Sequence, residues 1–119
     1  MRLVVQKVQE ASVIINKEVY SSINKGLLLY IAFCNTDTNL DLEWSVNKIM
    51  KLKLFQGESL EDICGDILIV SQFTLFASIK KGTKPSWSKA ADPNYAKLLY
   101  NDFIMLVKKK NIGNIQTGV

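Results

Sequence analysis

Short hydrophobic runs broken by polar residues over the first part of the chain predict β-structure. Residues 2–8 and 11–15 are rich in β-branched side chains, and a polar Asn16-Lys17 pair follows the second run. This pattern indicates antiparallel strands and a hairpin that turns at Asn16 and Lys17. Residues 27–33 are uninterruptedly apolar, so we expect a strand in the middle of a sheet with both faces buried.

The next segment, residues 39–54, repeats apolar residues at helical spacing. Thr38 can cap this helix, with Asp41 three positions later in a weaker form of the capping box. We expect Trp44 to lie in the core or in a dimer interface. A short polar connection, residues 56–65, follows this helix.

A second helix is expected after Asp92, which can serve as its N-cap, with Pro93 at the first helical position. Asn111 or Gly113 can end it. Its predicted core face consists of Tyr95, Leu98, Leu99, Phe103, Leu106 and Val107. The order of strands, helix, strand and helix predicts an α+β fold in which two main helices pack on an antiparallel sheet.

The composition indicates one globular domain, residues 1–119, with a single core. The chain is 48% hydrophobic and 22% charged, which is typical of a soluble protein. Its net charge of +4 permits nucleic-acid contact without establishing it. Cys34 and Cys64 form no Cys-x-x-Cys motif, and no apolar run approaches the roughly 20 residues of a membrane span. We therefore expect a cytoplasmic protein with no membrane role.

The chain contains no histidine, and this restricts its chemistry. Histidine is the usual general base near neutral pH and the commonest metal ligand. A Ser-His-Asp or Cys-His site is therefore impossible within the chain, and we expect no metal site and no cofactor. Any hydrolysis has to rely on binding, backbone dipoles, a non-histidine side chain or groups of the substrate.

The most informative segment is residues 66–76, whose apolar pattern predicts one strand over this whole range. A Ser71-Gln72-Phe73-Thr74 cluster interrupts the pattern. A plain core strand would not need these polar groups, which favours a site here. The alternative is that Ser71 and Thr74 are simply satisfied by hydrogen bonds on a strand.

A basic loop, residues 77–89, follows the cluster and contains no acid. Its candidate binding residues are Lys80, Lys81, Lys84, Pro85, Trp87 and Lys89. Such a loop either is only solvated or contacts an anionic ligand, with lysines for phosphates and Trp87 for stacking.

Short motifs are spread over nearly the whole chain. They include Lys25-Gly26-Leu27-Leu28, Asp37-Thr38, Val70-Ser71-Gln72-Phe73-Thr74-Leu75, Lys81-Gly82-x-x-Pro85-Ser86, Ala90-Ala91-x-Pro93, Leu99-Tyr100-x-x-Phe103 and Thr117-Gly118. In this order the motifs resemble those of the D-aminoacyl-tRNA deacylases, homodimeric enzymes that free tRNA from mischarged D-amino acids.

The resemblance implies a β-barrel-like sheet flanked by helices and a homodimer with the pocket at the subunit interface. It also implies that the 3′-terminal adenosine of D-aminoacyl-tRNA enters the pocket and that the tRNA's own 2′-hydroxyl assists ester cleavage. The pocket residues would be Ser71, Gln72, Phe73 and Thr74, with Phe73 and neighbouring backbone amides polarising the scissile carbonyl. Thr74 would have a positioning role, because the chain offers no base to activate it.

Three departures from the family accompany the resemblance. Lys7, a candidate substrate-binding residue, stands where the family usually has arginine. The connection 56–65 is shorter than usual, and the sequence ends at Val119, before the family's Asn-x-Gly-Pro motif that excludes L-amino acids. The expected function is hydrolysis of D-aminoacyl-tRNA, with RNA and not DNA as the partner. The alternative is a truncated, non-catalytic homologue that binds RNA or only dimerises.

Overall fold

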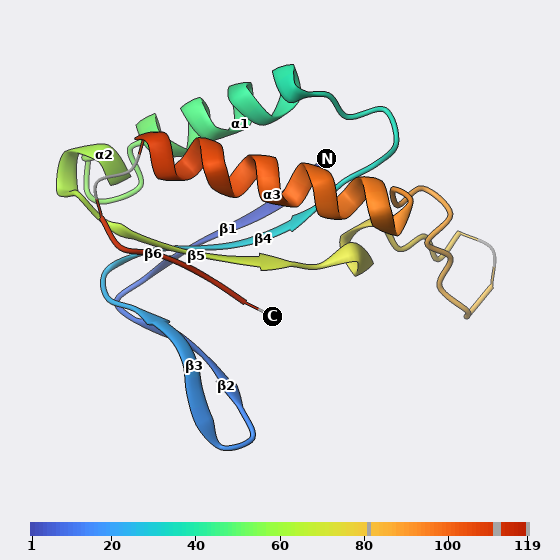
Figure 1. Ribbon diagram of the computed structural model, residues 1–119, viewed down its shortest axis with the longest axis horizontal. Coiled ribbons are helices and arrows are strands. Elements are labelled where there is room, and N and C mark those ends of the chain that lie inside the picture. The colour runs from blue at the N-terminus through green and yellow to red at the C-terminus, as the bar shows by residue number, and fades with distance from the viewer. Residues whose placement is uncertain (81, 111–112, 119) are drawn as a thin grey trace.

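One sheet, a projecting hairpin and a layer of helices make up the fold (Figure 1). The computed structural model describes residues 1–80, 82–110 and 113–118. The strands are β1 (Arg2–Val8), β2 (Ala11–Ile15), β3 (Glu18–Ile23), β4 (Gly26–Ala32), β5 (Asp66–Ser71) and β6 (Ile115–Thr117). The helices are α1 (Asn39–Lys51), α2 (Leu60–Ile63), the 3₁₀ helix η1 (Phe73–Phe76) and α3 (Pro93–Lys110).

The main sheet is mixed, with the strand order β1-β4-β5-β6. β1 pairs antiparallel with β4, whereas β4 with β5 and β5 with β6 are parallel pairs. The predicted α+β class is confirmed, but the sheet is not antiparallel throughout. The reason is that α1 connects β4 to β5 and α3 leads from β5 to β6, and such crossovers return the chain to run in the same direction.

The hairpin β2–β3 projects from the sheet on the side away from the long helices (Figure 1). Asn16 and Lys17 at its tip have φ values of 51° and 67°. Two consecutive positive φ values are the signature of a type I′ turn, whose twist suits a two-residue hairpin. The predicted turn is therefore confirmed.

The caps that were predicted for both long helices are present. Asp41 Oδ2 accepts a hydrogen bond from the Thr38 amide at 2.8 Å, at the start of α1. Asp92 Oδ2 accepts from the amides of Asn94 at 3.1 Å and Tyr95 at 3.3 Å, at the start of α3. α1 ends at Lys51, three residues before the predicted end.

The connection 56–65 contains the short helix α2, which the sequence analysis missed. Its signal was a second capping box, in which Ser59 Oγ accepts from the Asp62 amide at 3.1 Å and Asp62 Oδ2 accepts from the Ser59 amide at 2.9 Å. At the other end of the chain, α3 ends at Lys110; Asn111, a predicted helix end, lies outside the described residues.

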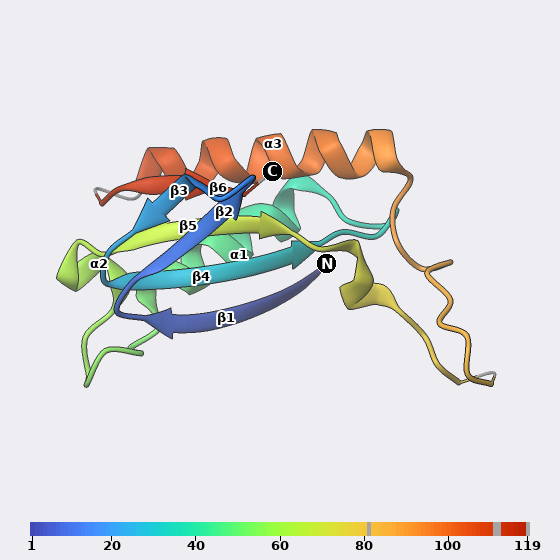
Figure 2. The ribbon, with the colours of Figure 1, turned by 90° about the horizontal axis from the view of Figure 1, so that it is seen from below.

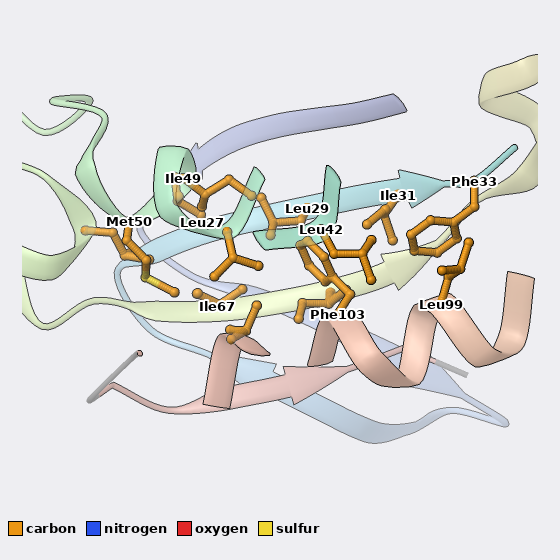
Figure 3. Packing of buried hydrophobic residues seen from close by; sticks show 14 of the residues in the cluster. Leu27, Leu29, Ile31, Phe33, Leu42, Ile49, Met50, Ile67, Leu99 and Phe103 are labelled. Carbon is orange, nitrogen blue, oxygen red and sulfur yellow. The ribbon is translucent and has the colours of Figure 1, made fainter. Parts of the chain in front are cut away.

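The core lies between one face of the sheet and the layer formed by α1 and α3 (Figures 2 and 3). β4 is the central contributor, and its residues Leu27, Leu29 and Ile31 are all fully buried. In Figure 3 these side chains meet residues of β5, α1 and α3, among them Ile67, Leu42, Ile49, Leu99 and Phe103. The predicted central strand is confirmed as Gly26–Ala32, but only one of its faces is fully buried, because Leu28 and Tyr30 on the other face are half-buried.

Leu98, which was predicted to face the core, does not face it, and Trp44, which was predicted to lie in the core or in a dimer interface, is not in the core. Trp44 on α1 is 67% exposed, and Leu98 on α3 is 55% exposed. On α1 the buried positions are 42, 45 and 46, and on α3 they include 99 and 103. These positions face the sheet, so Trp44 and Leu98 lie on the outer side of their helices. The other predicted core residues of α3 are buried or half-buried.

Replacing Phe103 by alanine is expected to lower the free energy of unfolding by about 3–5 kcal/mol, because the residue is completely buried and leaves a cavity. Leu98→Ala, on the same helix but exposed, is the matched control and should change stability by no more than about 0.5 kcal/mol. Urea denaturation of both variants measures the difference. Equal losses would contradict the assignment of the core face of α3.

Candidate functional site

The Ser71-Gln72-Phe73-Thr74 cluster lies where β5 ends and the backbone turns into η1. The Gln72 amide donates to the Ile31 carbonyl at 2.8 Å, which extends the β4–β5 pairing by one residue. Beyond it, the Leu75 amide donates to the Gln72 carbonyl at 3.2 Å and the Ala77 amide to the Thr74 carbonyl at 3.0 Å. The prediction of one strand over 66–76 is therefore wrong: local turn hydrogen bonds replace ladder bonds after Ser71.

Within this turn the four predicted residues have different environments. Gln72 Nε2 donates a hydrogen bond to Thr74 Oγ1, and both side chains are half-buried. Ser71 is exposed at the end of the strand, and Phe73 is 60% exposed. The side chains of Gln72 and Thr74 therefore hydrogen-bond to each other within the turn, whereas those of Ser71 and Phe73 are exposed.

A cavity of about 550 Å³ opens beside the turn, and its lining is mainly apolar. It is lined by Ser71, Phe73, Trp87, Ala90, Ala91, Pro93, Ala96, Lys97 and Tyr100. We call it the turn cavity. Phe73 and Trp87, both lining residues, meet in a T-shaped contact, with ring centroids 5.8 Å apart and planes inclined by 61°. Cavities of this size accept a small ligand or one end of a large one.

The basic loop extends outward beyond η1 and returns to the start of α3 (Figure 2). Ser78 and Ser86 form an isolated bridge, with amide-to-carbonyl distances of 2.6 and 2.8 Å, that closes the loop at its base. Farther along, the Ala91 amide donates to the Phe33 carbonyl at 2.8 Å. These bonds anchor both ends of the segment that places Trp87 against Phe73.

Three of the predicted lysines gather in a second cavity, of about 240 Å³. Its lining consists of Ser78, Lys80, Lys84, Ser86, Ser88 and Lys89, and we call it the lysine cavity. Three ammonium groups with three hydroxyls form a surface suited to an anion such as a phosphate. Lys81 lies outside the described residues, and Pro85 is exposed beside Lys84.

The structure separates Lys7 from the other predicted site residues. Lys7 pairs with Leu27 near the start of β4, whereas Ser71 pairs with Ile31 near its end. Four residues of strand correspond to about 13 Å. Within one protomer, Lys7 therefore lies toward the opposite end of the sheet from the turn cavity.

Tyr100 and Lys97 on α3 also line the turn cavity, and the sequence analysis did not select them. The Tyr100 hydroxyl donates to the Ile69 carbonyl at 3.1 Å, which ties the helix to β5. Burial, with a smaller contribution from Tyr20, raises the pKa of Tyr100 above its usual value. The available signal was a tyrosine hydroxyl within the core-packed face of α3.

A third cavity, of about 380 Å³, lies between the start of the chain and α1. Met1, Leu3, Asp37, Asp41, Trp44 and Ser45 line it. Its buried carboxylate already has a partner, because Asp37 Oδ2 lies 2.8 Å from the Met1 ammonium group.

No three Cys, Asp or Glu side chains of the described residues are grouped to hold a metal ion. No helix within the described part of the chain is long and apolar enough to cross a membrane.

Comparison with known proteins identifies relatives along the whole chain. The family described as D-Tyr-tRNA(Tyr) deacylase matches residues 4–119. The D-aminoacyl-tRNA deacylase of Thermosipho melanesiensis is 43% identical over 124 residues, which cover 99% of this chain and 83% of that protein. The D-aminoacyl-tRNA deacylase of Flavobacterium johnsoniae is 41% identical over 125 residues, covering all of this chain and 83% of that protein.

Two solved structures are similar in fold. The c-Myc DNA Unwinding Element Binding Protein superposes with a TM-score of 0.92 at 35% identity, over all of this chain and 85% of that one. A probable eukaryotic D-amino acid tRNA deacylase superposes with a TM-score of 0.80, over 91% of this chain and 67% of that one. At 24% identity, this second likeness supports the fold alone.

Proposed function

This chain belongs to the D-Tyr-tRNA(Tyr) deacylase family, and we propose that it hydrolyses the ester bond of D-aminoacyl-tRNA at the turn cavity. Water adds to the ester carbonyl, the bond to the ribose oxygen breaks, and a free D-amino acid and tRNA are released. The reaction is a quality-control step of translation, and its place is the cytoplasm, where charged tRNA is used. The observation that carries the proposal is the placement of Ser71, Phe73 and Trp87 around one cavity.

The shape and chemistry of the turn cavity suit the 3′ end of a charged tRNA. Phe73 and Trp87 offer exposed aromatic faces and edges against which an adenine ring can stack. The small residues Ala90, Ala91 and Ala96 leave room beside them for the aminoacyl group. Lys97 adds a positive charge to the lining of the same cavity.

Catalysis in this site has to proceed without histidine. Backbone amides of Phe73 and its neighbours are suitable donors to the developing oxyanion, because fixed dipoles need no proton transfer of their own. The substrate's 2′-hydroxyl supplies the group that assists cleavage. Thr74 Oγ1 is already an acceptor for Gln72 Nε2, so its role is to hold the turn rather than to attack the ester.

The lysine cavity provides a place for the tRNA backbone. Lys80, Lys84 and Lys89 lie in the same loop as Trp87, and this loop joins the lysine cavity to the turn cavity. A nucleotide chain whose last base stacks near Trp87 would carry its preceding phosphates past these ammonium groups. Positive charge at this position also speeds the encounter with a polyanion.

A homodimer is the proposed assembly, with the turn cavity at the subunit interface. Ile14 and Val19 form a cross-strand pair on the projecting hairpin and are 64% and 63% exposed. A two-stranded hairpin is only marginally stable alone, so packing of this apolar pair against another surface would stabilise it. A second copy of the chain is the partner that would cover them.

Activity is tested with D-Tyr-tRNA, which the wild-type chain should hydrolyse. Phe73→Ala should raise KM by roughly 10–100-fold, because one base-stacking contact is lost. Thr74→Val should lower kcat by less than about 100-fold, whereas loss of a nucleophile typically costs about 10⁴-fold or more. Thr36→Val, an exposed threonine outside the site, is the control. Failure of the wild-type chain to hydrolyse D-Tyr-tRNA would favour the alternative, a non-catalytic homologue.

The tRNA-binding role of the lysine cavity is tested by replacing Lys80, Lys84 and Lys89 together with alanine. Binding should weaken, and the slope of log K against log[salt] should become shallower by about 2, since each phosphate contact contributes about 0.7–0.9. The matched control replaces Lys51, Lys108 and Lys109, which removes the same charge from exposed positions elsewhere. If both triple variants lose affinity equally, the loop has no specific role.

The dimer is tested by sedimentation equilibrium, which should give twice the chain mass of 13.4 kDa. Val19→Lys should shift the equilibrium toward monomer, because it places a charge in the proposed interface. Lys17→Glu, at the tip of the same hairpin, is a control for an exposed substitution outside the apolar pair. A monomer at all concentrations would exclude this assembly.

A further inference from the structure

Arg2, at the start of β1, makes two contacts with the turn that follows β5. Its Nη1 donates to the Leu75 carbonyl at 2.7 Å, across 73 positions of the sequence. Its Cζ lies 4.7 Å from the centroid of the Phe76 ring, in a cation–π arrangement. Phe76 is only 7% exposed, so the guanidinium rests on a ring that is itself fixed in the structure.

These two contacts involve Leu75 and Phe76, the last two residues of η1. The carbonyls of Gln72 and Thr74 accept bonds from amides of the turn. The Leu75 carbonyl, by contrast, accepts its hydrogen bond from Arg2. The bond is charge-assisted and short, lies at the solvent-exposed surface, and links the turn to β1.

The sheet register makes this link short and direct. Arg2 pairs with Ala32 at the end of β4, and the adjacent Ile31 pairs with Ser71 at the end of β5. The start of β1 and the start of the turn therefore lie at the same end of the sheet, with the end of β4 between them. A movement of the guanidinium would be transmitted to Leu75 and, through the short turn, to Phe73.

We propose that Arg2 is a positioning residue for the reaction: it fixes the Gln72–Phe76 turn in the orientation that presents Phe73 and the backbone amides to the scissile ester. This role rests on the hydrolysis proposed above. Arg2 does not line the turn cavity, so it acts through Leu75 and Phe76 and not by contact with substrate. The requirement is for a planar guanidinium that can bond and stack at once, which an ammonium group cannot do equally well.

The kinetic test compares Arg2→Gln and Arg2→Lys with wild type in hydrolysis of D-Tyr-tRNA. A misplaced turn should lower kcat by about 10–100-fold in Arg2→Gln, because small displacements of catalytic groups are costly. KM should rise as well, but less than in Phe73→Ala, because the turn moves while the aromatic ring is kept. Arg2→Lys should recover part of kcat, since it keeps the charge. The control is Lys25→Gln, which removes a cation from above Phe55, a ring outside the site, and should leave both constants unchanged.

A second measurement does not depend on activity. Amide hydrogen exchange by NMR should be at least about 10-fold faster for Leu75 and Ala77 in Arg2→Gln than in wild type, with the amides of Leu29 and Ile69 unchanged. This pattern, together with the loss of kcat, supports the proposal. Unchanged exchange in the turn would overturn it, as would a uniform rise in exchange across the core, which means general destabilisation. If the wild-type chain proves inactive, the proposed function fails, and the exchange data alone decide whether Arg2 orders the turn.

Discussion

The parallel pairing of β4 with β5 is the constraint on which the rest of the structure depends. β4 supplies the buried centre of the core, and its pairing fixes how far β5 runs before the chain turns. The last bond of this pairing, from the Gln72 amide to the Ile31 carbonyl, sets the starting point of η1. A shift of one residue in this register would exchange the two faces of β5 and move Ser71 and Phe73 away from the cavity.

The site is built by three segments that converge on the end of this pair. The turn contributes Phe73, the basic loop contributes Trp87, and α3 contributes Tyr100 from the helical layer. Each segment is held by a backbone hydrogen bond or a side-chain bond to a backbone carbonyl. Apolar surface lies where the terminal nucleoside is proposed to bind, and the ammonium groups of the lysine cavity lie in the adjoining loop. This separation of apolar surface from positively charged surface matches a ligand with an aromatic end and an anionic backbone.

Local signals in the sequence were sufficient for much of the fold. Caps at Thr38 and Asp92 and the Asn16-Lys17 turn act over a few residues, and all three occur as predicted. The parallel pairing could not be predicted in the same way, because strand direction depends on how distant segments meet. Similarly, the apolar residues Leu75 and Phe76 continued the pattern of a strand, although Phe76 is buried in a turn beneath a residue 74 positions away.

Prediction of the site was limited for the same reason. The polar cluster at the end of β5 and Trp87 could be selected from sequence because their residue types are unusual in their surroundings. Tyr100 shares its helix face with core residues, and its place in the cavity follows only from the packing of α3 on β5. The role of Lys7 stays a prediction; within one chain the register places it toward the other end of the sheet from the turn cavity.

The central claim is that the turn cavity receives the D-aminoacyl end of tRNA, and NMR titration with a non-hydrolysable ligand tests it most directly. The ligand is adenosine carrying D-tyrosine through a 3′-amide in place of the ester. The account predicts saturable shifts of the amides of Phe73 and Ala91 and of the Trp87 indole. Shifts confined to the cavity beside Trp44, with the turn unperturbed, would contradict it.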